Sequence, residues 1–275
     1  MGQQHEFRSV VAETLLIPLY MRAKESRRGS GAILKDDWAE RLVKVIGYDY
    51  SKFDNAPLSE VGCVVRGWYF DNAVKRFIES KACPVVVNVG CGLDTRYQRI
   101  GDYGGKAMFY ELDLPEVISL RRGLIPETAN DRYIAASLLD VDWLDRLRRT
   151  HPCSDFIFVF EGVLMYFYEM QVRQVLHSIS SRFGGGEIWF DVCGTMMSRH
   201  GVKPDSMHDS KAQIRSGISD GHIVERWEPQ LSLIEQANYM KFYRRRWGFF
   251  FGQVLGRMPR LCYKFSSLLG YRIKI

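Results

Sequence analysis

The chain has 275 residues, of which 46% are hydrophobic and 25% charged, a composition ordinary for a globular protein with a large core. No apolar run reaches the roughly 18–20 residues that a membrane-spanning helix requires, so we expect no membrane span. The net charge of +6 has its basic excess at the C-terminus, because residues 236–275 hold nine Lys or Arg and no Asp or Glu, leaving 29 basic and 32 acidic residues elsewhere. Such a tail suits nucleic acid, an anionic membrane surface or an acidic small molecule.

Helices are predicted for the first eighty residues. Residues 3–25 carry apolar side chains at helical spacing, which Pro18 is expected to disturb. Asp36 and Asp37 are typical of a helix start, and Gly47 of its end. A third helix is predicted over 58–80. We therefore expect residues 1–80 to form a helical segment that covers the site.

The pattern then changes to short apolar strands separated by helices. The strands are predicted at 85–89, 108–113, 132–137, 155–160 and 187–193, with helices at 94–100, 115–123, 142–149 and 168–183. This alternation predicts an α/β fold with a parallel, doubly wound sheet. Two more strands are expected near 230–243 and at 271–275, and the polar stretch 194–228 as an insertion or lid. Residues 81–275 would then form a domain that makes one compact unit with the helical segment.

Two glycines follow the first predicted strand in VVVNVGCGLDTR. Gly90 and Gly92 allow the backbone to approach a ligand where a Cβ would collide. A dinucleotide fingerprint would need a third glycine where Thr95 stands, and Asp94 would repel a pyrophosphate. S-adenosylmethionine has no phosphate, so the turn favours it over NAD or FAD and disfavours a dinucleotide oxidoreductase.

Two acidic residues follow other strands. Asp113 lies 23 residues past Gly90, where a carboxylate can accept hydrogen bonds from ribose hydroxyls. The alternative role for Asp113 is to cap the helix that begins at Pro115. Glu161 ends an apolar strand, and a buried carboxylate is costly unless a cation meets it. Either the ammonium group of the cofactor or an internal salt bridge would supply that cation.

Five motifs in order resemble the leucine carboxyl methyltransferase family. They are GCGLDTR, YELDLPEV, EGVLMY, TLLIPLYMRAKES at 14–26 and SGISDGHIVERWEPQLSLIEQ at 216–236. The last is similar to the small-molecule branch, the polyketide carboxyl O-methyltransferases of the tetracenomycin type. The resemblance implies a seven-stranded class I methyltransferase sheet, Rossmann-like, with an N-terminal helical extension, an insertion after the fifth strand and S-adenosylmethionine as cofactor.

The resemblance also implies which residues contact the cofactor. Early arginines near its carboxylate fall on Arg22 and Arg66, and the adenine-side pair falls on Ser137 and Leu138. At that pair the family has Asp where this chain has Ser, so a hydroxyl must bond the adenine amine. The other implied contacts are the glycine loop, the ribose acid and the ammonium-side acid, namely Gly90, Gly92, Asp113 and Glu161.

The expected reaction is methyl transfer to oxygen. A carboxylate acceptor is ionised at neutral pH and needs no general base, in keeping with a sequence that has no Ser-His-Asp set and no metal cluster. A phenol or hydroxyl acceptor would require a base, for which His200 is best placed. Tyr166 is the candidate catalytic residue, because its ring or hydroxyl can stabilise a sulfonium.

The basic, aromatic stretch MKFYRRRWGFFFGQ has two interpretations. In an enzyme, its arginines attract an anionic substrate and Phe249–Phe251 provide apolar walls for a small acid, with no nucleic acid as partner. In a non-catalytic protein, it binds RNA or a membrane surface. The six cysteines lack a CxxC spacing and are expected to be buried thiols without metal, which favours a cytoplasmic location.

Overall fold

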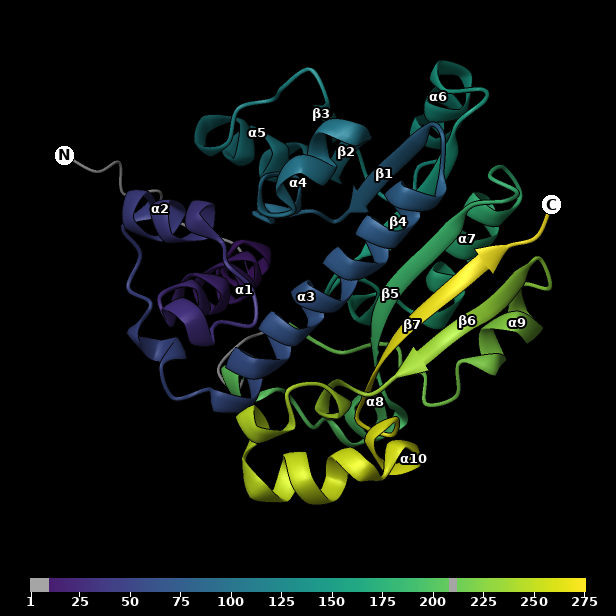
Figure 1. The fold of residues 1–275 in the computed structure, drawn as a ribbon. Helices are drawn as coiled ribbons and strands as arrows, with labels where there is room; N and C mark the ends of the chain where they lie inside the picture. Colours follow the sequence, from purple (N-terminus) through teal and green to yellow (C-terminus); the bar gives the residue numbers. More distant parts are fainter. Residues whose placement is uncertain (1–9, 208–211) are drawn as a thin grey trace.

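The computed structural model describes residues 10–207 and 212–275, with side chains from residue 14 onward. Its strands form one seven-stranded sheet in the order β3-β2-β1-β4-β5-β7-β6 (Figure 1). The strands are β1 (Pro84–Val89), β2 (Met108–Asp113), β3 (Asp131–Ala135), β4 (Asp155–Phe160), β5 (Glu187–Cys193), β6 (Leu231–Ala237) and β7 (Ser266–Ile273). The five strands predicted before residue 194 are confirmed to within two residues at either end.

The sheet is mixed rather than parallel. Strands β1 to β5 pair in parallel, but β7 runs antiparallel to both β5 and β6. The parallel arrangement predicted from the alternation of strands and helices is therefore confirmed for β1 to β5, whereas β7 departs from it, because antiparallel neighbours need no crossover helix between them. Strand β7 also begins at Ser266, five residues earlier than predicted. The serines and Gly270 weaken its sequence signal, and pairing on both sides supplies its hydrogen bonds.

Three helices precede the sheet: α1 (Val10–Ser26), α2 (Asp37–Ile46) and α3 (Pro57–Ser80). Helix α1 continues through Pro18, contrary to the expected disturbance. Leu16, Leu19 and Met21 are fully buried within it, and this packing offsets the backbone hydrogen bond that proline cannot donate. The predicted cap of α2 is confirmed, since a side-chain oxygen of Asp36 accepts a hydrogen bond from the Ala39 amide. We propose that the helical segment ends at residue 80, where the methyl-transferring domain of residues 81–275 would begin.

Both faces of the sheet are buried, as near-continuous apolar strands predict. Successive residues of β1 point into different cores: Val85 and Val87 pack with α6 (Asp142–Thr150) and α7 (Glu169–Ser180), whereas Val86 packs with α3. The remaining helices are α4 (Arg96–Arg99), α5 (Pro115–Leu124), α8 (Thr195–His200), α9 (His222–Trp227) and α10 (Pro259–Cys262). Within the described ranges, none of the helices is long and apolar enough to cross a bilayer.

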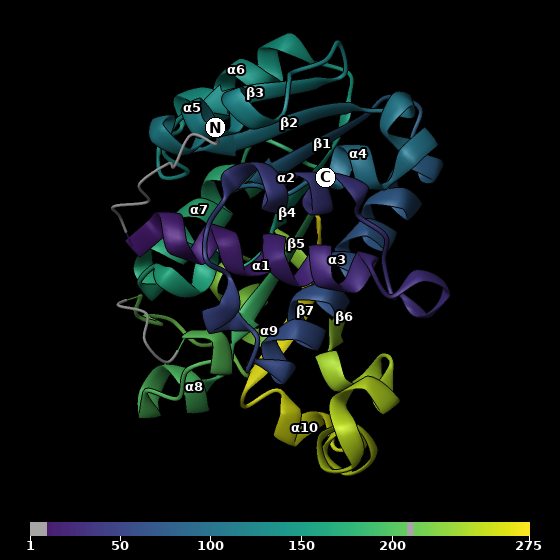
Figure 2. The same cartoon turned by 90° about the vertical axis from the view of Figure 1, so that its left-hand side faces the viewer.

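The stretch 194–228 includes α8 and α9 and contacts the N-terminal helices. The Asp205 carboxylate accepts hydrogen bonds from the Leu58 and Ser59 amides, at 2.8 and 2.9 Å, in the first turn of α3. These amides have no partner within their own helix, and a carboxylate satisfies them well. Figure 2 shows α1 crossing in front of the sheet and α8 below it. Through Asp205, the insertion is therefore attached to the start of α3.

Candidate active site

A cavity of about 540 Å³ lies beside the carboxyl ends of β1 and β4. The strand order reverses between these two strands, and ligands of doubly wound folds bind at that point. Its volume is in the range of small-molecule sites. The lining includes six of the residues predicted from the sequence: Arg22, Arg66, Gly90, Gly92, Glu161 and Tyr166.

The glycine turn has left-handed backbone at both predicted positions. Gly90 has φ = 70° and Gly92 has φ = 50°, a region that other residues rarely adopt. The turn folds back onto β2, since the Gly90 and Cys91 amides both donate to the Leu112 carbonyl. A Cβ on Gly90 would lie 2.5 Å from a Val163 methyl carbon, and one on Gly92 would lie 2.8 Å from a Leu15 methyl carbon. The absence of side chains thus lets α1 and the segment that follows β4 approach the turn.

Replacing Gly90 by alanine is expected to lower the free energy of unfolding. The left-handed backbone costs about 1–2 kcal/mol, and the contact with Val163 adds about 1–3 kcal/mol. Gly101→Ala is the matched control, because Gly101 has φ = 61° and an open space around it. Urea unfolding should show a larger loss for Gly90→Ala than for Gly101→Ala, with partial recovery in the Gly90→Ala/Val163→Ala double variant. Equal losses would contradict the steric role of Val163.

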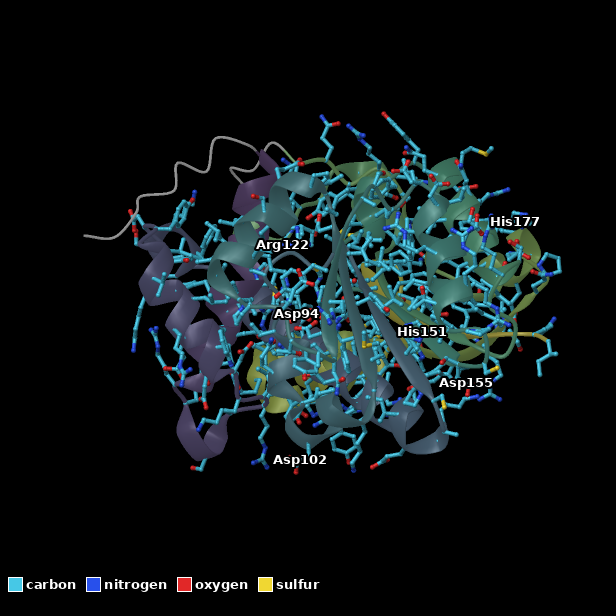
Figure 3. All side chains as sticks on the ribbon, turned by 90° about the horizontal axis from the view of Figure 1, so that it is seen from above. Asp94, Asp102, Arg122, His151, Asp155 and His177 are labelled. Atoms are coloured by element: carbon cyan, nitrogen blue, oxygen red, sulfur yellow. The ribbon has the colours of Figure 1, made fainter. Side chains whose placement is uncertain are left out.

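A buried ionic network surrounds the turn. The Asp94 carboxylate lies 2.9 Å from Arg99, 3.4 Å from Arg96 and 3.7 Å from Arg22. Burial alone would raise the pKa of Asp94, but these three guanidinium groups hold it well below its usual range. Figure 3 shows Asp94 between the N-terminal helices and the sheet. The ion pairs connected to Asp94 join four arginines, Arg22, Arg66, Arg96 and Arg99, with five carboxylates, Asp36, Asp71, Asp94, Glu161 and Asp191.

Glu161 meets cations of the protein itself. Its carboxylate pairs with Arg96 and, at 3.3 Å, with Arg66. Arg66 also bonds Asp191 at 2.9 Å. Sequence reasoning missed Asp191, although an acid in the middle of the apolar run IWFDVC was the available signal. Its carboxylate also accepts from the Gly162 amide at 2.6 Å and the Tyr239 hydroxyl at 3.1 Å, so it connects the ends of β4 and β5.

The remaining predicted cofactor residues lie beyond the described lining of this cavity. Asp113 accepts hydrogen bonds from the Gly92 and Leu114 amides, both at 2.8 Å, and burial raises its pKa. Ser137 and Leu138 follow β3, next to Asp113, whose carbonyl accepts from the Ala136 amide. The Ser137 hydroxyl oxygen accepts from the Leu139 amide at 3.2 Å. The structure therefore joins Asp113 to the glycine turn and places the serine one strand further along.

The described cavity wall includes no histidine, the side chain that most often acts as a base near neutral pH. Burial raises the pKa of Tyr166, whose hydroxyl lies 3.7 Å from the Met207 sulfur. Burial also raises the pKa of Tyr239. His200 is exposed at the end of α8 and is not part of the lining. In Figure 3 the labelled His151 and His177 lie farther from α1 and α2 than Asp94 does.

Two expectations about the lining and the cysteines are corrected. Only Phe251 of the three consecutive phenylalanines lines the cavity, whereas Phe249 and Phe250 are exposed, because of the three only Phe251 packs against the core that contains Trp247. All six cysteines are free thiols, but Cys83 and Cys153 are exposed rather than buried, since they lie in the turns before the amino ends of β1 and β4. In the described part of the chain, no group of three or more His, Cys, Asp or Glu could hold a metal ion.

The chain is similar in sequence to known methyltransferases. Residues 16–180 match the model of the leucine carboxyl methyltransferase family. The tetracenomycin polyketide synthesis O-methyltransferase of Streptomyces glaucescens is 30% identical over 82% of each chain. An S-adenosyl-L-methionine-dependent methyltransferase of Gibberella zeae is 28% identical over 67% of this chain and 66% of its own.

A solved structure shares the fold at low sequence identity. It comes from a Thermobifida fusca protein described as a candidate methyltransferase, with a TM-score of 0.58, 13% identity and coverage of 93% of this chain and 94% of the other. Together with the sheet order, this likeness gives the chain a class I methyltransferase fold. The match over residues 16–180 and the 30% identity to the Streptomyces enzyme show that the chain belongs to the leucine carboxyl methyltransferase family.

Proposed function

We propose that this enzyme transfers a methyl group from S-adenosylmethionine to the carboxylate of a small, largely apolar acid. The observation that carries this proposal is the cavity wall, which combines charged pairs with apolar surface and has no described histidine. The relative in Streptomyces glaucescens is named for tetracenomycin polyketide synthesis, which supports a polyketide-like acid as acceptor. The free thiols of all six cysteines support the cytoplasm as its location.

The cofactor residues are proposed from their positions around the glycine turn. When bound, S-adenosylmethionine supplies an electrophilic methyl group on a sulfonium, and it also carries an ammonium and a carboxylate. The network has one more carboxylate than arginines, so a ligand with a net positive charge offsets the excess. Glu161 is suited to the ammonium, and Arg22 and Arg66 to the carboxylate. Both Asp113 oxygens keep a lone pair for ribose hydroxyls beyond their amide bonds.

The adenine side is assigned by the order of the strand ends. Ser137 and Leu138 lie in the loop after β3, beside β2, where the hydroxyl of Ser137 would bond the adenine amine. Tyr166 ends the 3-10 turn Leu164–Tyr166 and lies on the cavity wall next to Met207, where its ring would face the sulfonium.

The acceptor side is apolar and adaptable. Four methionines, two of them from the insertion, line the wall together with aromatic side chains: Met165, Met197, Met207, Met240, Trp247, Phe251 and Phe265. Thioethers conform to ligands of varied shape and make favourable contacts with aromatic rings. Lys203 brings an ammonium group to the same wall and would attract a carboxylate. This lining suits an acid with a planar, apolar body.

Methyl transfer would depend on positioning rather than on proton removal. A carboxylate with a pKa of about 4 is already ionised, so the enzyme has to align oxygen, methyl carbon and sulfur and exclude water. Burial raises the pKa of the phenols of Tyr166 and Tyr239 and of the Cys63 and Cys193 thiols, which therefore stay protonated. The network carboxylates are occupied by arginines. These facts favour a carboxylate over a phenol acceptor.

The rate of methyl transfer is expected to be nearly constant between about pH 6 and 8 with an aromatic acid. A phenol acceptor without a base would instead react faster as the pH approaches its pKa of about 10. The measurement uses aromatic acids, their methyl esters and matching phenols at saturating cofactor. Methylation of the esters at their phenol groups, with the free acids unchanged, would replace the carboxylate by a hydroxyl acceptor.

A further inference from the structure

The chain between β6 and β7 forms a projecting lobe, which we define as residues 241–264. It consists of short helical turns, Arg244–Trp247, Phe249–Val254, Leu255–Arg257 and Pro259–Cys262. Figures 1 and 2 show this lobe, in yellow and yellow-green, at the opposite end of the molecule from α6. It is held to α1 by two hydrogen bonds from Arg246 to Glu25, at 2.9 and 2.6 Å.

The two sides of the lobe differ. Trp247, Phe251 and Leu255 line the cavity on its inner side. On the outside, Phe249 is 79% and Phe250 59% exposed. Tyr243, Val254 and Met258 are also exposed, so the apolar side chains outside recur through most of the lobe. Single exposed apolar residues are ordinary, but a cluster that includes two adjacent phenylalanines indicates a binding surface.

The outside of the lobe is also positively charged. Arg245, Arg257, Arg260 and Lys264 are exposed, and no carboxylate of the described residues forms a salt bridge with any of them. Residues 236–275 contain no acidic residue at all. Thus the positive charge of these groups is not neutralised locally, and it lies beside the exposed phenylalanines.

We propose that the lobe docks the enzyme onto an anionic lipid surface. Phenylalanines inserted at the headgroup boundary, with arginines and lysines beside them, are the combination by which peripheral proteins bind such surfaces. An anionic bilayer offers an apolar layer and continuous negative charge together. Unlike a protein partner, it does not have to be complementary in shape to the short helical turns of the lobe. Docking through Phe249 and Phe250 places the cavity directly behind the bound surface, so an apolar acceptor could pass from the lipid to the wall formed by Trp247 and Phe251.

The test is sedimentation of the full chain with lipid vesicles, without cofactor or acceptor. Vesicles of phosphatidylcholine with about one third phosphatidylserine should retain at least tenfold more protein than pure phosphatidylcholine, at about 0.1 M salt. Phe249→Ala/Phe250→Ala and Arg257→Glu/Arg260→Glu should each weaken the retention about tenfold or more. Arg148→Glu/Arg149→Glu makes the same change of charge in α6, at the other end of the molecule, and should retain most of the binding.

The remaining outcomes overturn the proposal. Equal retention by both kinds of vesicle, or no loss in the lobe variants, would contradict it. Self-association of the parent that disappears in Phe249→Ala/Phe250→Ala, without retention by vesicles, would assign the surface to a second copy of the chain. Circular dichroism of each variant shows whether the fold is kept. Because vesicle binding is measured without methyl transfer, its failure leaves the proposed carboxyl methylation intact.

Discussion

Replacing Arg96 by alanine is expected to lower the free energy of unfolding by about 3–5 kcal/mol, the scale for breaking a buried ion pair. Arg96 is 1% exposed, and its guanidinium bonds Asp71 at 2.9 Å, the Asn88 amide oxygen and Glu161. Without Arg96, these acceptors stay buried but have lost a cation that pairs with them. Because water does not reach them, the free energy of the folded state rises.

The control for this prediction is a surface arginine. Arg122 is half exposed and pairs with Glu127 at 2.9 Å, so Arg122→Ala should cost less than about 1 kcal/mol. Arg96→Lys keeps the charge but lacks the forked donors, and it should fall between the two. Urea unfolding of all three variants, with m-values compared, measures the differences. A loss for Arg96→Ala as small as that for Arg122→Ala would show that the network rearranges without it.

Glu161→Gln is expected to weaken S-adenosylmethionine binding by about ten- to a hundredfold, the scale of a lost charge-assisted hydrogen bond. The side chain keeps its size, but the network loses the negative charge that lies on the cavity wall. Its amide can still accept one hydrogen bond from Arg66 or Arg96. Calorimetry with the methyl donor and with its demethylated product measures the change, since both carry the ammonium group.

Asp71→Asn separates a direct contact from a general effect of charge. Asp71 bonds Arg96 and Arg99 in the same network but is not part of the cavity lining. The substitution removes an equal charge from a buried position and should reduce stability while leaving the cofactor dissociation constant within about threefold. Equal weakening of binding in both variants would show that Glu161 acts through the total charge and does not contact the ammonium.

The positions of the first five strands along the chain, and the glycine turn, could be predicted because their signals are local. A run such as VVVNV cannot avoid burial, and the left-handed backbone at Gly90 and Gly92 admits few other residues. The cap at Asp36 and the helix end at Gly47 were predictable for the same reason. Five motifs in order were likewise sufficient to indicate the family, because each combines such a local constraint with its place along the chain.

The partners of the charged residues were decided by the tertiary structure. Glu161 was recognised as needing a cation, but that Arg66 and Arg96 supply it depends on how α3, α4 and β4 meet. Asp191 and Asp71 gave weaker signals, since a single acid in a strand or helix is usually solvated. The early start of β7 and the outward direction of Phe249 depended on pairing and packing partners distant in sequence. Hydrophobic patterning records whether a side chain is buried, but charge pairing is specified only by distances between segments that folding brings together.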